Sequence, residues 1–588
     1  MTSAGRYYPS SSMSDRLYKP IESYGAIGNL RSVGLIGADG SLDWLCMPNM
    51  ASGSVFAALL DHRKGGRFKV WVDGASSRQR YIDGTNVLRT AFLPKGSIVS
   101  MMDFMPLWGS IRGKGHSHAL KEVHRLVGCR GLDVDVRVEW SPRPDYARKR
   151  AIVERDRDAW VARWDDGQMS LCGLPEGELE EGEHGPTVKG TFHIKRNEER
   201  ALVTRYLSDD VSCSVTSGQE LLKRTVDTWR GWVNTPLGHQ NPEWAREWTH
   251  MVSRSELALK LLIHDDTGAM VAAATTSLPE LMGGDLNWDY RYSWLRDASM
   301  AAQALLALGH PEEAVEYLEW IRDASEASCA VVWEPRIMYG THGEKDLKEV
   351  ELTHLDGYRS SRPVRIGNGA AEQRQLEVYG ELISTGYELM RHGVNMDEST
   401  MRFLSRAADK VCEIWEQPDS GIWERRGREY HYTYSKVMLW VALDRAIHMA
   451  DKYGLEGDAK RWGRAGDRIA ETVLREGYSK ERGAFTEYFG GDALDAANLR
   501  IPLMEILPFG DARVQGTIDR IVEELLEGGM LARNTEGVEK GEGAFIMCSF
   551  WLVQVLALSG RTREARAFLE NAAEVASPLG LFAEMFDP

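Results

Sequence analysis

Residues 217–233 read SGQELLKRTVDTWRGWV, and this stretch separates two parts of the chain that follow different patterns. The spacing of its apolar residues predicts a helix. Ser217 is followed three residues later by Glu220, which matches a capping box, so we expect the helix to begin at Ser217. Short alternating runs come before this stretch, and long runs with helical spacing follow it. The sequence therefore predicts a multidomain β + α protein.

The part before the linking helix is β-rich. Strand-like runs such as RFKVWVDG (67–74), LDVDVRVEW (132–140) and PTVKGTFHI (186–194) are separated by Gly, Pro and Asp. Asp39-Gly40, within GLIGADGSLDWLCMP, is typical of a hairpin turn. Several short strands with turns between them favour an antiparallel β-sandwich. We expect domains at residues 1–216 (β-sandwich), 217–240 (helical linker) and 241–588 (helical).

Beyond residue 240 the spacing predicts eleven helices. They are expected at 243–264, 294–308, 311–326, 370–393, 398–415, 433–453, 457–476, 494–501, 511–528, 543–559 and 562–575. Two connections, 265–293 and 327–369, are too long to be plain turns and contain many aromatic and charged residues. Long ordered loops on a rigid scaffold are where binding sites tend to lie, so we expect the site there.

Composition argues against several classes of partner. The net charge is −16 and no block of Lys or Arg is present, whereas nucleic acid and anionic membranes require a basic surface. No run reaches the roughly 18 apolar residues of a membrane-spanning helix, and the N-terminus has no apolar signal core. The seven cysteines are scattered singly, which fits the reducing cytoplasm. We expect a cytoplasmic protein; its oligomeric state cannot be predicted from the sequence.

Metal and nucleophile motifs do not stand out. His116 and His118 form an isolated HxH pair without a nearby carboxylate or thiol, which is more typical of a loop than of a metal site. A GxSxG elbow and a phosphate-binding Gly-Lys-Ser/Thr loop are both missing. The glycines of GLIGADG lead into a turn and a strand, not into a helix, so they do not form a dinucleotide site.

Carboxylates beside aromatic residues are more suggestive. In DSGIWERRG (419–427), Glu424 directly follows Trp423, and partial desolvation by an indole would raise its pKa and suit it to donate a proton. Local sequence alone leaves open a surface glutamate paired with the arginines that follow. Glu584, in GLFAEMFDP (580–588), is equally open to a surface role. The polar and aromatic stretch NWDYRYSWLRDAS (287–299) precedes a helix without revealing its ligand.

Nine stretches in order resemble glycoside hydrolase family 15, the group of glucoamylases and bacterial trehalases. They are PIESYGAIGNLRSVGLIGADGSLDWLCMP (20–48), TTSLPE (275–280), NWDYRYSWLRDAS (287–299), IMYGTHGEKDL (337–347), HLDGYRSSRPVRIGNGAAEQRQ (354–375), DSGIWERRG (419–427), TYSKVMLWVALDRA (433–446), GEGAFIMCSFWLV (541–553) and ASPLGLFAEMFDP (576–588). The resemblance implies an N-terminal antiparallel β-sandwich followed by an (α/α)6 barrel. It also implies exo-acting hydrolysis of α-linked glucosides with inversion of configuration.

The resemblance also assigns roles to residues. Glu424 matches the general acid and Glu584 the general base, and their carboxyl groups are expected about 6.5–9.5 Å apart to admit a water. The residues that match or accompany the family's sugar-binding groups are Arg296 and Asp297, which grip hydroxyls, Tyr290 and Trp294, which line the pocket, and Trp423, Arg365 and Tyr358 as further contacts. Neither a metal nor an organic cofactor is implied.

The expected substrate is a small α-linked glucoside. RPVRIGNGAAEQRQ is closest to bacterial trehalases, so trehalose is the first choice; a glucoamylase-type or isomaltose/maltooligosaccharide glucohydrolase is the alternative. A second alternative is a non-catalytic carbohydrate-binding protein. Family members usually continue past the base with Gly-Asn-Phe-Pro-Gln and another helix, whereas this sequence ends at Pro588. Either the sequence is trimmed or the barrel lacks its last helix, and an open barrel would leave Glu584 on a frayed end.

Overall fold

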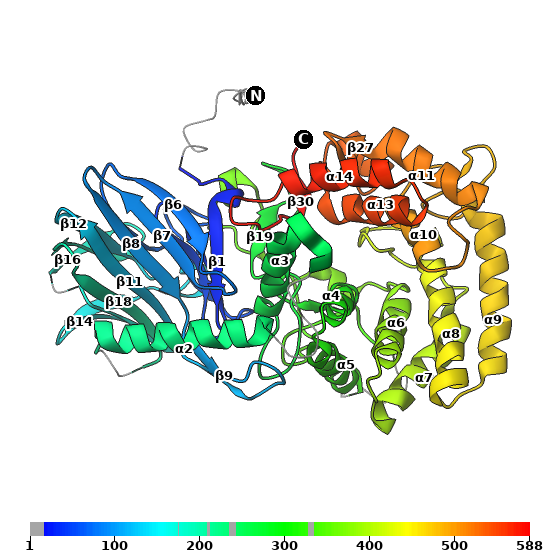
Figure 1. Cartoon of the computed structure of the whole chain (residues 1–588), viewed down its shortest axis with the longest axis horizontal. Coiled ribbons are helices and arrows are strands. Elements are labelled where there is room, and N and C mark those ends of the chain that lie inside the picture. Colours follow the sequence, from blue (N-terminus) through cyan, green and yellow to red (C-terminus); the bar gives the residue numbers. More distant parts are fainter. Residues whose placement is uncertain (1–16, 175, 209–211, 235–242, 327–333) are drawn as a thin grey trace.

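The structure is a computed structural model that describes residues 17–174, 176–208, 212–234, 243–326 and 334–588. Figure 1 shows a β-rich part formed by the N-terminal third of the chain beside a larger helical part formed by the rest. This confirms the predicted order of an antiparallel β domain followed by a helical domain. None of the helices within the described ranges is long and apolar enough to cross a membrane.

Two eight-stranded antiparallel sheets form the β domain. The first has the order β1 (Tyr24–Gly28), β2 (Val33–Gly37), β3 (Ser41–Cys46), β5 (Phe68–Trp71), β12 (Val134–Trp140), β17 (Gly185–Ile194) and β16 (Gly177–Gly182), with β4 (Ser54–Phe56) paired to β3. The second has the order β13 (Ile152–Asp156), β14 (Ala159–Trp164), β15 (Gly167–Cys172), β18 (Glu199–Tyr206), β11 (Glu122–Gly131), β8 (Ser97–Phe104), β7 (Leu88–Leu93) and β6 (Ser76–Tyr81).

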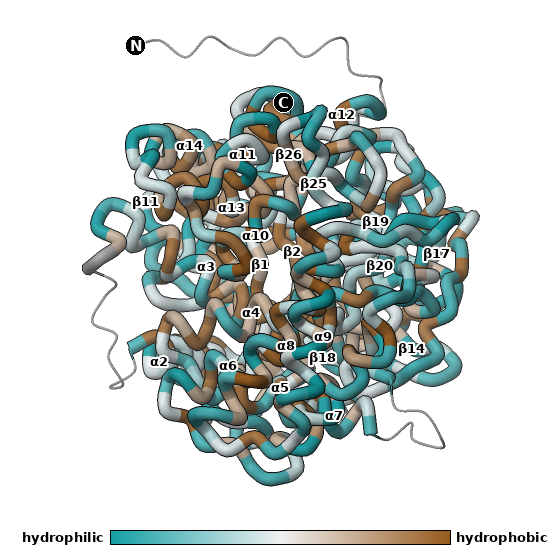
Figure 2. Tube along the Cα trace, turned by 90° about the vertical axis from the view of Figure 1, so that its right-hand side faces the viewer, coloured by the Kyte–Doolittle hydropathy of each residue, from teal (hydrophilic) through white to brown (hydrophobic). Residues whose placement is uncertain are grey.

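One apolar core joins the two sheets. Val138 of the first sheet and Met101 and Leu202 of the second belong to the same buried cluster. Along β8 buried side chains alternate with more exposed ones, as expected of a strand with one face on a core. Brown, hydrophobic segments lie mainly inside the outline of the molecule in Figure 2, with teal segments around them.

The predicted hairpin at Asp39-Gly40 connects β2 to β3. Gly40 has φ of 79°, and a Cβ there would lie 2.1 Å from the carbonyl oxygen of Val70. The buried guanidinium of Arg125 donates to the Gly40 carbonyl at 2.7 Å and to Asp103 at 2.8 Å. The turn therefore requires glycine both for its backbone angle and for the close approach of the neighbouring strand.

Helix α2 (Val215–Val233) links the two domains. The prediction that it begins at Ser217 is wrong, because Ser214 is the last extended residue and its side chain accepts a hydrogen bond from the Ser217 N–H at 3.1 Å. At its other end, Trp232 is buried and donates to Glu313 in the helical domain at 2.6 Å. The linker is thus packed against the helical domain.

The helical domain contains helices α3 to α14. They are α3 (Thr249–Leu261), α4 (Leu295–Ala307), α5 (Pro311–Glu326), α6 (Val378–Arg391), α7 (Glu398–Ile414), α8 (Thr433–Tyr453), α9 (Ala459–Thr472), α10 (Arg500–Leu503), α11 (Ala512–Leu525), α12 (Thr535–Lys540), α13 (Ile546–Leu558) and α14 (Thr562–Glu574). Helix α4 packs on α5 and α6, α8 on α6 and α9, and α13 on α14. Helices therefore pack both on the next helix and on the next but one along the chain, while the complete (α/α)6 arrangement stays a prediction.

Three parts of the helical prediction need correction. The helix expected at 370–393 begins only at Val378, because the preceding residues are held by other bonds, including one from the Leu376 N–H to Asp419 at 3.0 Å. The helix expected at 494–501 is a 3-10 turn, Ala496–Leu499, followed by the short α10. Helix α12 was not predicted, since its six residues are too few to show a period.

The backbone at Glu584, expected to be frayed, is held in place. Met585–Phe586 form β30, which pairs with β29 (Ala544–Phe545). The Glu584 carbonyl also accepts a hydrogen bond from the Ile546 N–H at 3.0 Å. Strand pairing with the start of α13 thus fixes this glutamate beside the helical domain.

Candidate active site

The stretch NWDYRYSWLRDAS folds as two short strands and the first turn of a helix. Asn287–Asp289 form β20 and Ser293–Trp294 form β21, which pairs with β22 (Met338–Tyr339). Arg296 and Asp297 follow at once in the first turn of α4. The strand pairing therefore fixes the point at which the helix presents these two charged side chains.

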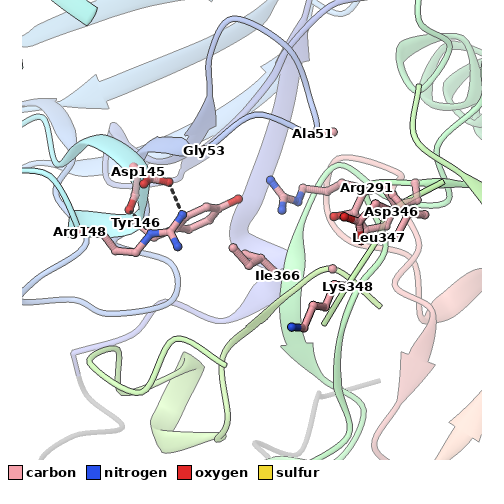
Figure 3. Close-up of a pocket in the computed structure, with 12 residues that line it drawn as sticks. Ala51, Gly53, Asp145, Tyr146, Arg148, Arg291, Asp346, Leu347, Lys348 and Ile366 are labelled. Carbon is pink, nitrogen blue, oxygen red and sulfur yellow. Dashed lines mark hydrogen bonds and ion pairs between the residues drawn. The ribbon is translucent and has the colours of Figure 1, made fainter. Parts of the chain in front are cut away.

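Side chains on the two sides of this strand have different surroundings. The rings of Tyr290 and Trp294 pack with their centroids 5.6 Å apart. Arg291 points the other way, is buried, and donates to the two oxygens of Asp289 at 2.8 and 2.7 Å. Figure 3 shows Arg291 pointing toward Tyr146 of the β domain in a cavity of about 330 Å³ between the domains. Arg291 thus fixes the strand, and Tyr290 and Trp294 face the other side.

Glu424 receives two hydrogen bonds from this stretch. The Trp294 indole N–H donates to Glu424 Oε1 at 2.7 Å, and the Arg296 Nη2 donates to the same oxygen at 3.2 Å. Glu424 has φ of 57°, which is unusual for a residue with a side chain. Its own carbonyl accepts from the Gln373 side-chain amide at 3.0 Å. Side chains from two separate loops therefore hold the glutamate in a strained backbone conformation.

The surroundings of Glu424 favour its protonated form. Burial raises the pKa of the Glu424 carboxyl, which the positive charge of Arg296 opposes and the negative charge of Asp297 reinforces. Arg296 Nε in turn donates to Asp297 Oδ2 at 3.0 Å. The side chain of Asp297 is 36% exposed against 12% for Arg296, so its carboxylate is the accessible member of the pair. Such a site can donate a proton and bind hydroxyl groups.

The arginines that follow Glu424 pair with other carboxylates. Arg425 forms an ion pair with Glu487 at 2.7 Å, and Arg426 pairs with Glu349 at 2.6 Å. The alternative of a surface glutamate paired with its own neighbours is therefore wrong, because those guanidinium groups point to different loops.

Trp423, the residue before Glu424, belongs to a second aromatic cluster. Its indole N–H donates to the buried Asp495 at 2.9 Å, and its ring packs on Phe545 with centroids 5.4 Å apart. The guanidinium of Arg533 lies 5.9 Å from the Trp423 ring and 5.8 Å from the Phe545 ring. Phe545 belongs to β29, which pairs with β30 directly after Glu584. This cluster therefore adjoins the segment that carries Glu584.

Glu584 has a second set of charged neighbours. The residue is exposed, yet the protein around its carboxyl group disfavours the charge, and Glu280 adds repulsion, so its pKa is raised to about 8 despite the nearby Arg533. The Tyr290 hydroxyl has its pKa raised by burial and then by the charges of Glu584, Glu280 and Glu424. Tyr290 therefore lies within the electrostatic reach of both candidate catalytic carboxyl groups; their separation of 6.5–9.5 Å stays a prediction.

Comparison with known proteins identifies the family. The sequence profile described as glycosyl hydrolases family 15 matches residues 248–581, and that of the trehalase-like N-terminal domain matches residues 13–171. This chain belongs to glycosyl hydrolase family 15. It is a glycoside hydrolase.

Named relatives agree with the family, and a solved structure shares the fold. A trehalase from Thermoplasma volcanium is 34% identical over 97% of this chain and 90% of its own length. A trehalase from Mycobacterium tuberculosis is 34% identical over 100% of this chain and 89% of its own length. A bacterial glucoamylase complexed with acarbose, 13% identical, superimposes with a TM-score of 0.70 over 96% of this chain and 89% of its own. At that identity the superposition shows a shared fold alone.

Two residues that the family resemblance suggested as sugar contacts have their polar groups bound within the protein. Tyr358 is 1% exposed, and its hydroxyl donates to the Lys19 carbonyl at 2.7 Å where the two domains meet. Arg365 packs over the Trp288 ring at 4.5 Å and donates to the carbonyl of Asp285 at 2.7 Å. Both hold the loops that carry the family 15 motifs, so we leave them out of the sugar pocket proposed below.

Sequence reasoning overlooked several polar residues of this family 15 site. Asp495 binds Trp423, and Glu280 and Arg533 lie around Glu584. Each is a single polar residue in a loop, without a local pattern of its own. The available signal was that Glu280 closes TTSLPE, one of the stretches that carry the resemblance.

Proposed function

We propose that this enzyme hydrolyses trehalose with inversion, using Glu424 as the general acid and Glu584 as the general base. The observation that carries the proposal is the environment of Glu424, a half-buried carboxyl with a raised pKa that is bound by Trp294 and Arg296. The trehalases that match this chain over nearly its whole length support the choice of substrate. The alternatives are isomaltose and maltooligosaccharides.

Each carboxyl group has one proton to move. Glu424 donates its proton to the oxygen between the two glucose units as the C1–O bond breaks. A water molecule attacks C1 from the opposite side, and Glu584 accepts a proton from that water as the new C1–O bond forms. The attacked glucose leaves as the β anomer and the other as the α anomer, and the next cycle requires Glu584 to lose its proton and Glu424 to regain one.

The remaining residues bind and orient the first glucose. Asp297 accepts hydrogen bonds from sugar hydroxyls, and Arg296 donates to sugar oxygens while it holds Glu424. Tyr290, Trp294 and Trp423 offer aromatic faces to the C–H surfaces of the ring. The chemistry uses neither a metal nor an organic cofactor, and retention of activity after dialysis against a chelator tests that prediction.

The anomers of the product test the mechanism. Proton NMR during the first minutes with trehalose should show equal amounts of α- and β-glucose. Release of α-glucose alone would refute inversion. Initial rates with isomaltose and maltotriose, measured in parallel, decide between trehalose and the alternative substrates.

Substitution of the two glutamates tests their roles. We expect Glu424→Gln and Glu584→Gln each to lower kcat on trehalose by about 10²-fold or more. α-Glucosyl fluoride needs little protonation of its leaving group, so it should restore activity to Glu424→Gln but not to Glu584→Gln. Equal rescue of both variants, or of neither, would contradict the assignment of acid and base.

We also propose that the enzyme works in the cytoplasm. Buried free thiols, as are usual in a reducing compartment, occur at Cys46, Cys129, Cys172 and Cys548. Fractionation of cells that express the native gene would test this location.

A further inference from the structure

Glu280 is a buried carboxylate to which the proposed mechanism gives no role. It directly follows β19 (Thr276–Pro279), and its side chain is 5% exposed. The Tyr290 hydroxyl donates to Glu280 Oε1 at 3.2 Å, and Arg533 Nη2 donates to Oε2 at 2.6 Å. Each oxygen therefore holds a side chain from a different loop of the pocket.

Arg533 is itself fixed on several sides. Besides Glu280, it donates to Glu542 at 2.7 Å, and its guanidinium lies over the rings of Trp423 and Phe545. Phe545 pairs with Met585, the residue after Glu584. Arg533 thus contacts the Trp423 and Phe545 rings beside the segment that carries the proposed base.

We propose that Glu280 is a positioning residue for the base side of the pocket. By binding Tyr290 and Arg533, it keeps these two side chains near the Glu584 carboxyl. That carboxyl then stays oriented toward the attacking water. This inference rests on the proposed role of Glu584 as the general base. Glu280 needs no contact with the sugar, because it acts through the two side chains that it binds.

The charge of Glu280 has a second consequence. The groups that act on Glu584 are Glu280 and Asp297, which raise its pKa, and Arg533 and Arg296, which lower it. Replacing Glu280 by a neutral residue removes a repulsion while leaving both arginines present. The pKa of Glu584 then falls, and because the base must be ionised, activity extends to lower pH.

Glu280→Gln tests this, with Glu542→Gln as the matched control. Both substitutions remove one carboxylate partner of Arg533 at nearly the same distance, 2.6 and 2.7 Å, but only Glu280 is among the main charges on Glu584. We expect Glu280→Gln to move the acidic limb of kcat/KM for trehalose down by about one pH unit. It should also lower kcat about tenfold or more with little change in KM, whereas Glu542→Gln should leave the limb in place.

Thermal melting checks that each variant folds, and Glu280→Asp completes the experiment. The Asp variant keeps the charge but shortens the reach, so we expect a lower kcat with the acidic limb near that of the wild type. This variant also serves as the test if Glu280→Gln does not fold, and an unchanged kcat in it would overturn the proposal. An unmoved limb in Glu280→Gln, or equal shifts in Glu280→Gln and Glu542→Gln, would overturn it as well.

Glu584→Gln separates the failure of this inference from failure of the proposed function. If Glu584→Gln is inactive and the limb of Glu280→Gln does not move, only the role of Glu280 is wrong. If Glu584→Gln remains active on trehalose, the assignment of the base fails and the inference fails with it.

Discussion

Trp294→Phe removes the donor that lies closest to the proposed general acid. The indole N–H reaches Glu424 Oε1 at 2.7 Å and favours the ionised form of that carboxyl. A hydrogen bond to a charged group is worth about 1.5–3 kcal/mol, and one pKa unit corresponds to roughly 1.4 kcal/mol. The loss should therefore raise the pKa of Glu424 by about one to two units. Because Arg296 still donates at 3.2 Å, we expect a value near the lower end.

The pH dependence of kcat/KM for trehalose measures this shift. Glu424 acts while protonated, so activity falls as the pH rises through its pKa, and a higher pKa moves the basic limb to higher pH. Tyr292→Phe is the control, since its ring centroid lies 6.4 Å from that of Trp294 and only its hydroxyl is lost. A basic limb that stays in place or moves to lower pH in Trp294→Phe would refute the reasoning.

Three further substitutions test the stability of the fold rather than the reacting groups themselves. Burial raises the pKa of Glu316 from 4.5 to about 7, so its ionised form destabilises the fold increasingly as the pH rises between these values. Glu316→Gln should therefore stabilise the protein by up to roughly 3 kcal/mol at pH 8 but not at pH 4.5, which thermal melting at both pH values measures. Tyr358→Phe should cost about 1 kcal/mol of stability by removing the bond to Lys19, with KM unchanged; a raised KM would return Tyr358 to the sugar pocket. Arg425→Gln should lower stability by about 3–5 kcal/mol, because it strips a buried glutamate of its cation, and a melting temperature equal to that of the wild type would exclude this.

The division into β and helical domains was predictable because it depends on local period. Strands with one buried face alternate every two residues, and the long helices such as α5 and α8 repeat every three to four over several turns. The errors arise where tertiary bonds compete with propensity. The segment before α6 bonds to Asp419 instead of continuing the helix. Helix α2 starts at Val215 because the extended Ser214, and not Ser217, caps it.

The site was predictable in part, and by a different route. The bond between Trp294 and Glu424 spans 130 positions, so no local pattern could indicate it; both residues were found because each lies in a stretch that resembles the family. The same route proposed Tyr358 as a sugar contact, where the structure shows a buried residue between the domains. Resemblance transfers the position of a residue, whereas its contacts depend on how the loops fold around it.

A raised pKa does not by itself distinguish the acid from the base, because the pKa values of Glu424 and Glu584 are both raised. The distinction must come from the charges and donors around each group. Glu424 binds an indole N–H and a guanidinium that are fixed by the start of α4, next to the carboxylate proposed to bind the sugar. Glu584 lies between a carboxylate and an arginine that also bind each other. Since inversion requires one group protonated and the other ionised, the balance between Glu280 and Arg533 sets the lower end of the pH range in which the proposed mechanism can operate.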